Sequence, residues 1–329
     1  MIPLPLSILE VAMFEAGTSA AETVPGSVRL AQRAEQLGFQ RIWYAEHHSS
    51  PFLLDFPPAV VMAHMAAVTS SIRVGSGGVL APNHVPLSLA EQFGALAAFH
   101  PGRIDLGIGR GPGTMDERAA LALRRGAPTA GDEEYGEDVA AVLGLVGERQ
   151  EVPEPWLLAS STAGAARAAE LGLPMAFAYH IKPENALEAV ERYRDRFKPS
   201  RWSDTPRVLL SVETVCAETE AEAARLSRPV DIVRLGLLSG RGEQPLLGPE
   251  AAARRAFTEE EREMLENHSR ARAQGTSEQV ARHLAETGSR VGADELMLFT
   301  PVYDATSRIR CIERIAGVAG RSALRSSAG

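Results

Sequence analysis

The sequence has few cysteines, few aromatic residues and no long apolar runs. Its two cysteines, Cys216 and Cys311, stand far apart in apolar surroundings, which gives neither a disulfide framework nor zinc-ligand spacing. We expect both to be reduced core residues of a cytoplasmic protein. No stretch reaches the roughly 20 apolar residues that a membrane-spanning helix needs, so we expect no membrane partner. The N-terminus lacks the basic and apolar segments of a signal peptide, and we expect none.

Concentrated positive charge is also missing. The formal net charge is −8 at pH 7, and no dense run of lysine and arginine occurs. A nucleic-acid interface needs a concentrated basic face, so we expect no nucleic-acid partner. The 45% of hydrophobic residues is ordinary for a globular protein, and 329 residues are enough for a single α/β barrel.

Short apolar runs alternate with runs of helical period along the chain. One such helix, 25–37, places Val28, Ala31 and Ala34 on one face and ends at Gly38. Eight strands, each followed by helix, predict a (β/α)8 barrel, and a doubly wound open sheet is the alternative. The predicted strands are 6–9, 41–45, 72–80, 103–108, 156–160, 174–177, 207–215 and 295–300.

We expect residues 1–319 to form one barrel domain. An insertion at about 228–275, between strands seven and eight, is rich in arginine, glutamate, glycine and proline. Long insertions of this kind are usually lids or mobile loops, so we expect it to be mobile. The tail, 320–329, is small and polar, and we expect it to fray.

The barrel assignment provides a filter for site residues, because catalytic groups lie at the carboxyl ends of barrel strands. His64 falls inside a predicted helix and His100 at the opposite rim, and for both a structural role is favoured. The polar residues that follow predicted strands are His47, His48, Asn83, His84, Arg110, Ser160, Ser161, Tyr179 and His180.

Three interpretations are open for Glu46-His47-His48. A metal site would need more ligands, and adjacent histidines on a strand end point apart, so we expect no metal. In a structural role, buried Glu46 would anchor loop backbone while His48 packs. In a functional role, one histidine would transfer protons near neutral pH.

Glycines interrupt the third strand at Gly75, Gly77 and Gly78. Glycine weakens a strand, so three of them indicate either unusual backbone geometry or a flat ligand lying against the main chain. A β-bulge or a strand corner is the alternative.

Two segments suggest an anion site near strands four and five. Gly107-Ile-Gly-Arg-Gly111 lacks the full dinucleotide-binding pattern, but its glycines would let an anion approach Arg110. Ser160 and Ser161 precede a predicted helix, where hydroxyls and free N–H groups bind anions, although a simple N-cap is the commoner use. With an arginine at the neighbouring strand end, we expect a phosphate here.

Four segments together resemble the bacterial luciferase-like, flavin-dependent monooxygenases. Their order and spacing make the match specific, and the likeness runs through most of the chain. The segments are Trp43-Tyr-Ala-Glu-His-His48, Val74-Gly-Ser-Gly-Gly-Val79, Gly102-Arg-Ile-Asp-Leu-Gly-Ile-Gly-Arg110 and Leu171-Gly-Leu-Pro174. The resemblance implies a barrel that binds reduced FMN, reacts it with O2 and uses the flavin C4a-hydroperoxide to oxygenate a small organic substrate.

The resemblance also implies roles for particular residues. His47 would be catalytic, and the Gly77–Gly78 peptide would be cis. Gly109 stands where luciferase itself has a reactive cysteine, so light emission does not follow. The residues implied to bind the cofactor are Glu46, Ser76, Gly77, Gly78, Asn83, Arg110, Ser160, Ser161, Gly164, Ala178 and Tyr179.

Reduced FMN would come from a separate flavin reductase that uses NAD(P)H, and a homodimer would form through the apolar helix 57–69. Three alternatives stay open. The barrel could transfer hydride with the deazaflavin F420 or a nicotinamide. It could bind flavin without catalysis, or it could be a metal-dependent hydrolase.

Overall fold

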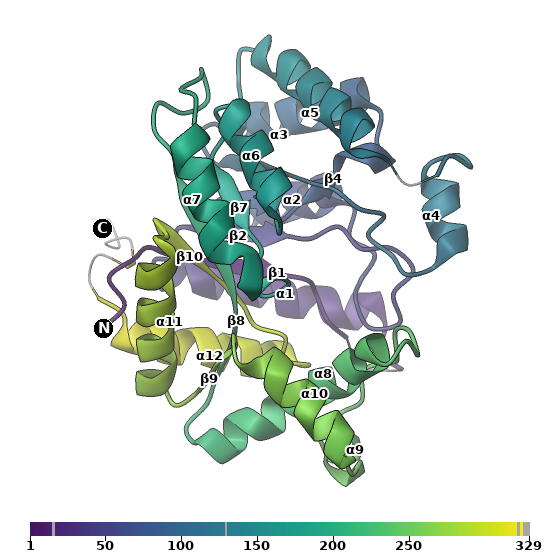
Figure 1. Ribbon diagram of the computed structural model, residues 1–329, viewed down its shortest axis with the longest axis vertical. Helices are drawn as coiled ribbons and strands as arrows, with labels where there is room; N and C mark the ends of the chain where they lie inside the picture. Colours follow the sequence, from purple (N-terminus) through teal and green to yellow (C-terminus); the bar gives the residue numbers. More distant parts are fainter. Residues whose placement is uncertain (15–16, 129, 321–322, 325–329) are drawn as a thin grey trace.

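Eight parallel strands close into a barrel in this computed structural model, which describes residues 1–14, 17–128, 130–320 and 323–324 (Figure 1). Strand β10 pairs with both β1 and β8, which closes the sheet. The (β/α)8 barrel is therefore confirmed, and the open doubly wound sheet is excluded. The barrel strands are β1 (Leu6–Glu10), β2 (Arg41–Tyr44), β3 (Arg73–Ser76), β5 (Ile104–Gly109), β6 (Glu154–Ala159), β7 (Met175–Phe177), β8 (Val208–Cys216) and β10 (Glu295–Phe299).

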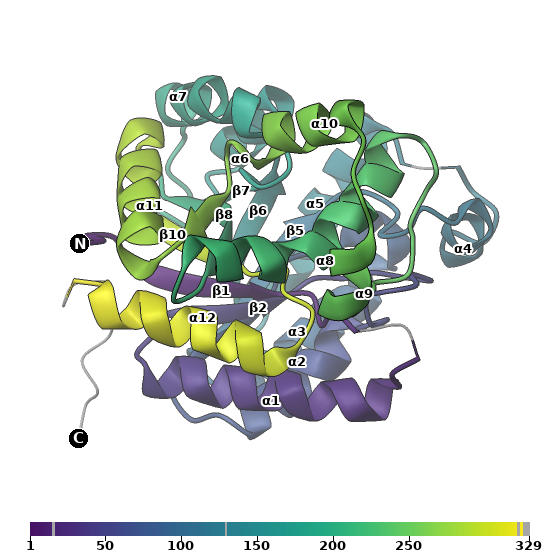
Figure 2. The ribbon, with the colours of Figure 1, turned by 90° about the horizontal axis from the view of Figure 1, so that it is seen from below.

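Helices surround the barrel, and α1 and α12 lie side by side on its outside (Figure 2). Both are amphipathic and bury one face against the strands. The helices are α1 (Ala20–Gln36), α2 (Pro58–Ala67), α3 (Pro86–Phe99), α4 (Glu117–Leu123), α5 (Asp132–Gly147), α6 (Thr162–Glu170), α7 (Ala186–Arg196), α8 (Glu220–Leu238), α9 (Pro249–Arg254), α10 (Glu259–Ser269), α11 (Ser277–Val291) and α12 (Ala305–Val318), with short 3₁₀ turns η1 (Ala81–Asn83) and η2 (Pro183–Asn185).

Helix α1 begins before the predicted Pro25. Ser19 caps it, since the Ser19 hydroxyl accepts from the Glu22 N–H and the Glu22 carboxylate accepts from the Ser19 N–H at 2.8 Å. This reciprocal capping box satisfies donors that the first turn leaves unpaired. Pro25 therefore lies inside the helix, near its start.

The third predicted strand, 72–80, is two strands rather than one. Strand β3 ends at Ser76, the Gly77–Gly78 peptide is cis, and β4 (Val79–Leu80) pairs with the end of β5. The cis geometry agrees with what the family resemblance implies.

A cluster of buried charges fills the amino-terminal end of the barrel. Asp105 is fully buried and accepts hydrogen bonds from Arg41, Arg73 and Trp43. Arg41 also donates to Glu295 at 2.9 Å. These charged residues are the first or second residues of four strands, and each is paired with an opposite charge. Paired charges in such a place hold the strands in register without needing water.

Apolar side chains fill the barrel above this charged layer. Trp43 and Trp156 pack edge to face, with ring centroids 5.6 Å apart. Leu9, Leu209 and Met297 belong to the same buried cluster. In barrels, catalysis occurs at the carboxyl ends of the strands. We call this end the mouth. The charged layer and the apolar layer both lie below it.

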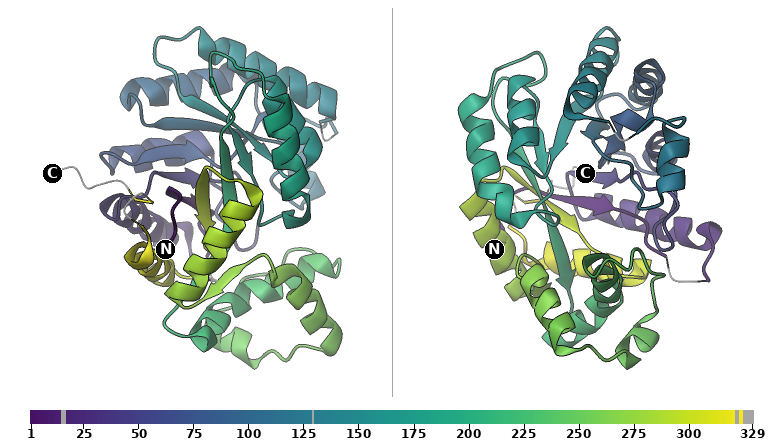
Figure 3. Two further views of the ribbon diagram at one scale, coloured as in Figure 1. Left: turned by 60° about the vertical axis from the view of Figure 1, so that its left-hand side comes forward. Right: turned by 45° about the vertical axis from the view of Figure 1, so that its right-hand side comes forward.

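The segment between β8 and β10 differs from the prediction at its start. Helix α8 runs through 228, so the predicted boundary falls inside a helix, with Pro229 within it. Helices α8, α9 and α10 gather into a lobe beside the barrel (Figure 3). Strand β9 (Ala273–Gly275) then joins the end of β8. The extra segment therefore begins after Leu238.

The prediction that the tail frays is wrong for the part that the structure describes. Ala323 is fully buried, and its carbonyl accepts from the Leu6 N–H at 2.9 Å. Gly320 donates to the Ile2 carbonyl. These bonds satisfy backbone groups at the start of β1, which holds the tail in place. Residues 321–322 and 325–329 lie outside the described residues.

Across the described residues, every helix falls short of the length and apolar character needed to cross a membrane.

Asp105 provides a test of the charged layer. Burial alone would raise its pKa, but Arg41 and Arg73 lower it overall. We expect Asp105→Asn to reduce the free energy of unfolding by about 3–5 kcal/mol, because it leaves buried arginine charge uncompensated. Urea denaturation at pH 7 measures this. Glu188→Gln, which breaks the exposed pair with Arg192, is the control and should change stability by less than about 0.5 kcal/mol.

The pH dependence of this effect has a defined sign. A carboxylate whose pKa is lowered by folding stabilises the fold above its unfolded pKa, near 4, and loses that contribution as the pH falls further. The difference between wild type and Asp105→Asn should therefore shrink below about pH 4. A difference that is unchanged at pH 3 would contradict this account.

Candidate active site

Glu46 organises the mouth. It is 3% exposed, and its carboxylate contacts His48 at 2.8 Å and His84 at 2.9 Å. It also accepts from the Leu80 N–H at 2.8 Å and from the Asn83 amide at 3.3 Å. We call Glu46, His48, Leu80, Asn83 and His84 the Glu46 cluster. It joins the end of β2 to β4 and η1.

The donors of the Glu46 cluster keep its carboxylate ionised. Burial alone would raise the pKa of Glu46, but the hydrogen bonds from His48 and His84 lower it to about 2. The Glu46 N–H also donates to the Gly78 carbonyl at 3.2 Å. These contacts support the structural interpretation of Glu46 and His48. They also occupy the Glu46 oxygens that the resemblance assigned to cofactor binding.

His47 follows directly and is different. Its Nδ1 atom is buried and has no hydrogen-bond partner in the part of the chain that the structure describes. Burial, together with the neighbouring His48, lowers the pKa of His47 to about 4. The ring is therefore neutral at pH 7 and can accept a proton. An unpaired buried nitrogen costs about 1–3 kcal/mol, which a ligand in the mouth would recover.

The glycines of the third strand are required by the packing of the barrel. A Cβ on Gly77 would lie 2.6 Å from Leu9 and 2.9 Å from Trp43. A Cβ on Gly78 would lie 2.9 Å from the Gly107 carbonyl oxygen. Any larger residue at these two positions would therefore disturb the core as well as a ligand.

Gly109 has more room than its neighbours. A Cβ there would meet only the tip of Leu80 at 3.1 Å, and its next neighbours lie at 3.8 Å or more. A small side chain at Gly109 would therefore need only a slight shift of Leu80.

Ser76 and Asn83 are partly committed to the fold. The Ser76 hydroxyl donates to the Gly107 carbonyl at 2.9 Å. The Asn83 amide nitrogen donates to Glu46 and to the Pro112 carbonyl. Its Oδ1 atom is buried and finds no partner among the described residues, so it can still receive a hydrogen bond from a ligand.

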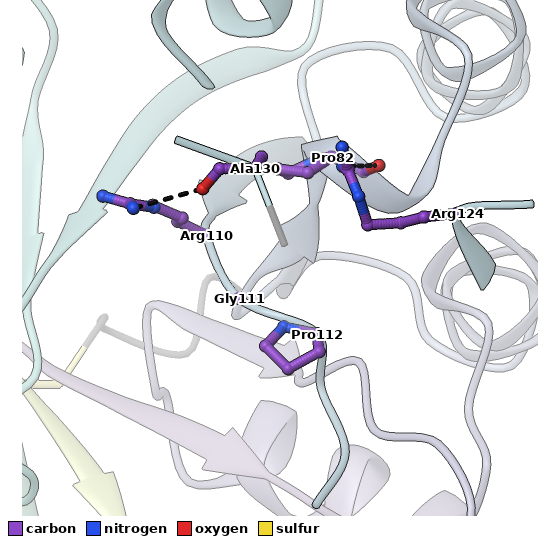
Figure 4. A pocket seen from close by; sticks show the side chains of 6 residues that line it. All are labelled: Pro82, Arg110, Gly111, Pro112, Arg124 and Ala130. Atoms are coloured by element: carbon purple, nitrogen blue, oxygen red, sulfur yellow. Dashed lines mark hydrogen bonds between the residues drawn. The ribbon is translucent and has the colours of Figure 1, made fainter. Parts of the chain in front are cut away.

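Arg110 lies at the end of β5 and is partly exposed. Its guanidinium pairs with Asp132 and donates to the Ala130 carbonyl at 3.2 Å (Figure 4). A small cleft of about 10 Å³ lies beside it, lined by Pro82, Arg110, Gly111, Pro112, Arg124 and Ala130. The partner of the Arg110 guanidinium is thus Asp132 in the first turn of α5, and its expected grouping with Ser160 and Ser161 around a phosphate stays a prediction.

Ser160 and Ser161 begin α6. The Ser161 hydroxyl accepts from the Gly164 N–H at 3.2 Å, so the N-cap interpretation is confirmed. The Gly164 N–H is therefore already used in the helix cap. The Ser160 carbonyl accepts from Asn185 at 3.0 Å. The N–H groups of the first turn of α6 still face outward at this helix end, as helix geometry requires.

Ala178 and Tyr179 follow β7. The Ala178 N–H donates to the Ala159 carbonyl at 2.8 Å. The Tyr179 ring is buried, and its hydroxyl accepts from Arg290 at 2.7 Å. Both residues thus help to join β7 to its neighbours, which leaves their predicted contacts with a flavin ring untested.

His180, the next residue, was among the polar residues expected at the ends of strands, but the sequence did not single out its partner, Ser211. The His180 Nδ1 atom contacts the Ser211 hydroxyl at 2.7 Å, and its ring packs on Phe299 with centroids 4.9 Å apart. Inward alternation along β8 could have placed Ser211 in the barrel, but nothing in the sequence marked its pairing.

Within the described residues, no three histidine, cysteine, aspartate or glutamate side chains come together as metal ligands.

Comparison with known proteins identifies relatives along nearly the whole chain. The family model for luciferase-like monooxygenases matches residues 7–295. "Uncharacterized protein YvbT" of Bacillus subtilis (strain 168) is 38% identical over 325 residues, covering 95% of this chain and 96% of that protein. "Luciferase-like monooxygenase" of Escherichia coli (strain K12) is 34% identical, covering 93% and 94%. "N-acetyl-S-alkylcysteine monooxygenase" of Bacillus subtilis (strain 168) is 30% identical, covering 92% and 94%.

Solved structures share the fold. The crystal structure of apo-MsnO8 superimposes with a TM-score of 0.84 at 31% identity, covering 95% of this chain and 98% of that one. The FMN complex of the oxygenating constituent of 3,6-diketocamphane monooxygenase from Pseudomonas putida has a TM-score of 0.70 at 17% identity, covering 98% and 99%. An F420-dependent secondary alcohol dehydrogenase has a TM-score of 0.72 at 12% identity, covering 97% and 100%. At such identities the last two show the fold alone. The chain belongs to the luciferase-like monooxygenase family.

Proposed function

We propose that this protein is a flavin-dependent monooxygenase that uses reduced FMN and O2 to oxygenate a small organic substrate. The observation that carries the proposal is the buried Nδ1 atom of His47, which has no partner among the described residues. It lies at the mouth of a barrel whose neighbouring strand ends are built from glycine. A neutral imidazole beside such a flat wall is suited to move protons on a planar redox cofactor.

The residues present fit the isoalloxazine ring. Gly78 and Gly109 carry no side chain at the ends of β3 and β5, and the Asn83 Oδ1 atom offers an unused acceptor for a ring N–H. When bound and reduced, the flavin would supply the electrons that activate O2.

The residues also fit a phosphate. The Arg110–Asp132 pair is exposed, with 42% and 72% of the two side chains accessible, so it contributes little to stability. A phosphate could therefore replace the Asp132 carboxylate at Arg110. The outward N–H groups at the start of α6 would add further donors.

The comparisons support this proposal through the names of the relatives. The family is named for monooxygenases, and one relative is named for oxygenating N-acetyl-S-alkylcysteine. A neighbour in the fold holds FMN and another holds an F420 adduct, so a deazaflavin enzyme that transfers hydride is the second candidate. Reduced FMN would reach this protein from a separate NAD(P)H-dependent flavin reductase.

Each residue of the mouth then has a task. His47 accepts or returns a proton, and the Glu46 cluster keeps the backbone around His47 and Gly78 in place. The segment after α8 serves as a lid. Leu246 from this segment is fully buried and belongs to the same apolar cluster as Phe52 and Leu53. A lid of this kind excludes water from a reactive site.

A homodimer is the proposed assembly, formed through α2 and α3. These neighbouring helices present exposed apolar side chains, with Val60 68% exposed, Leu87 50% and Phe99 77%. Contiguous apolar surface of this kind usually marks an interface.

The proposal is tested by anaerobic titration with FMNH2, followed by admission of O2. We expect saturable binding and O2 consumption in the presence of a substrate. Arg110→Ala should weaken FMNH2 binding roughly tenfold, because it removes the cation that would hold the phosphate. Arg192→Ala, which removes another partly exposed arginine from a pair with a carboxylate, is the control.

The titration also separates the two candidate cofactors. If the protein binds reduced F420 but not FMNH2, and if O2 is not consumed, the deazaflavin alternative replaces the proposal. Equal FMNH2 affinity in wild type and Arg110→Ala would show that Arg110 does not hold the phosphate.

His47→Ala tests the proton-transfer role. The variant should keep flavin affinity within about twofold. It should release H2O2 in place of oxygenated product, because no side chain at this position can donate or accept the proton. Product and peroxide are measured together per FMNH2 consumed. His100→Ala, at the opposite rim, should leave the ratio unchanged. Undiminished oxygenation by His47→Ala would rule out this role.

Val60→Glu tests the dimer. A charge at the centre of an apolar contact should convert a dimer into a monomer, which light scattering after size-exclusion chromatography detects. Leu121→Glu places the same charge on an exposed apolar residue of α4 and should leave the mass unchanged. A wild-type protein that is monomeric at all concentrations would end this proposal.

A further inference from the structure

His180 stands across the mouth from His47. In the closed order of the barrel, three strands separate β2 from β7 in either direction, so their carboxyl ends are diametrically opposite. His47 follows β2, and His180 follows β7. The two side chains are still close enough for a charge on His180 to lower the pKa of His47. A ligand that fills the mouth therefore passes between them.

The His180 ring is held in one orientation. Its N–H group on the main chain donates to the Ser211 carbonyl at 3.0 Å, and its Nδ1 atom contacts the Ser211 hydroxyl at 2.7 Å. Phe299 covers the ring at 4.9 Å between centroids. Ser211 and Phe299 lie on β8 and β10, two walls of the barrel. Only the Nε2 edge of the ring is left for other contacts.

The proton of the ring follows from these contacts. The Ser211 hydroxyl is nearly buried and has His180 Nδ1 as its one hydrogen-bond partner in the described parts of the chain. The Ser211 carbonyl oxygen is farther from Nδ1, at 3.3 Å, and already accepts the His180 main-chain N–H. The hydroxyl, whose own proton needs an acceptor, therefore donates to Nδ1 across the shorter contact, which puts the proton of the neutral ring on Nε2. That Nε2–H has no acceptor among the residues that the structure describes.

The surroundings favour a neutral ligand. Burial lowers the pKa of His180 to about 4, against the opposing influence of the Ser211 carbonyl and Glu213, so the ring carries no charge at pH 7. The nearest cations, Arg234 and Arg272, are both paired with Glu213 and Asp231. His268 also faces this corner, and its pKa is lowered by burial. Among the described residues around His180, both arginines are therefore already paired, and neither is free to balance a carboxylate.

The rest of the mouth is apolar. Met13, Phe52, Leu53, Val230 and Leu246 form the buried cluster over the barrel interior, with Phe299 packed against it. A ligand here needs an apolar body. Its one polar atom must be an acceptor that meets the Nε2–H, because a buried polar group without a partner is costly.

We propose that His180 is a specificity-determining residue for the organic substrate, and that its Nε2–H donates one hydrogen bond to a neutral carbonyl oxygen of a largely apolar molecule. Ser211 is the positioning residue that fixes the tautomer. The inference rests on the proposed function insofar as the mouth is a substrate site. It extends that function by naming the class of substrate and the group that selects it.

The test uses the full-length protein without flavin and three probes of similar size. They are benzylacetone, the hydrocarbon in which a methylene group replaces its carbonyl oxygen, and the carboxylate hydrocinnamate. Binding is measured by calorimetry and by ligand-observed NMR. We expect benzylacetone to bind roughly three- to tenfold more tightly than the hydrocarbon, the range that one net hydrogen bond provides. Hydrocinnamate should bind more weakly than the ketone.

Variants of His180 assign the difference to its ring. His180→Phe keeps a flat ring against Phe299 but has no donor, and it should bind the ketone and the hydrocarbon equally. His180→Gln places an amide N–H near the Nε2 position and should restore at least half of the preference. Thermal unfolding of each variant shows that the barrel is intact.

Ser211→Ala tests the tautomer. The measurement is the protonation of the His180 ring nitrogens, which would not change if Ser211 only packed against the ring. In wild type, ¹⁵N chemical shifts of the His180 ring should show a protonated Nε2. In the variant they should show a mixture of tautomers, and the preference for the ketone should fall. A protonated Nδ1 in wild type would overturn the proposal.

The remaining outcomes are also decisive. A wild-type protein that binds the ketone no more tightly than the hydrocarbon, or binds neither, overturns the inference, as does a preference that survives in His180→Phe. None of these measurements needs FMN. Failure to bind FMNH2 would therefore end the proposed function separately.

Discussion

The mouth of this barrel depends on one buried carboxylate. Glu46 receives hydrogen bonds from His48, which follows its own strand, and from β4 and η1, which lie more than thirty residues further along the chain. A carboxylate in this position is costly unless its oxygens are satisfied, and each donor that satisfies them also fixes a piece of chain. The position of His47 and of the Gly77–Gly78 corner is therefore a consequence of the Glu46 cluster.

The two ends of the barrel use charge for different purposes. At the amino-terminal end, Arg41, Asp105 and Glu295 pair with one another, so that all of the charge is consumed within the protein. At the mouth the paired carboxylate of Glu46 stands next to polar atoms that have no partner. The separation follows the rule that barrels place stability at one end and chemistry at the other. The packed rings of Trp43 and Trp156 lie between the two ends.

Much of this could be predicted from the sequence, because the signals were local. The alternation of strands and helices predicted the barrel, and the glycines at Gly77 and Gly78 indicated where the third strand would break. Ser161 before α6 had an N-cap as one of its two interpretations, and the hydroxyl does cap the helix. In each case the residues that determine the structure lie within a few positions of the feature.

The features that the sequence did not predict depend on distant partners. Arg110 pairs with Asp132, which the sequence places beyond a loop and an additional helix. Ala323 is held because its carbonyl meets the Leu6 N–H at the other end of the chain. Helix α8 continues through Arg228 and includes Pro229, and no local pattern indicated this continuation. The periodicity of apolar residues in the sequence gives no information on such pairings.

The contrast between Glu46 and its neighbours separates structural residues from ligand-facing ones. Every oxygen of Glu46 is used by the protein, so removing it would first cost order in the mouth. The Nδ1 atom of His47 and the Oδ1 atom of Asn83 lie on either side of it and are left unpaired. The fold satisfies one buried polar group fully and leaves neighbouring polar atoms without hydrogen bonds. Unpaired atoms of this kind lower stability, and a bound ligand would pair with them. The same reasoning applies to His180, whose Nδ1 edge is fixed by Ser211 while its Nε2 edge is not. Groups of this kind, rather than the most heavily bonded residues, determine what the mouth accepts.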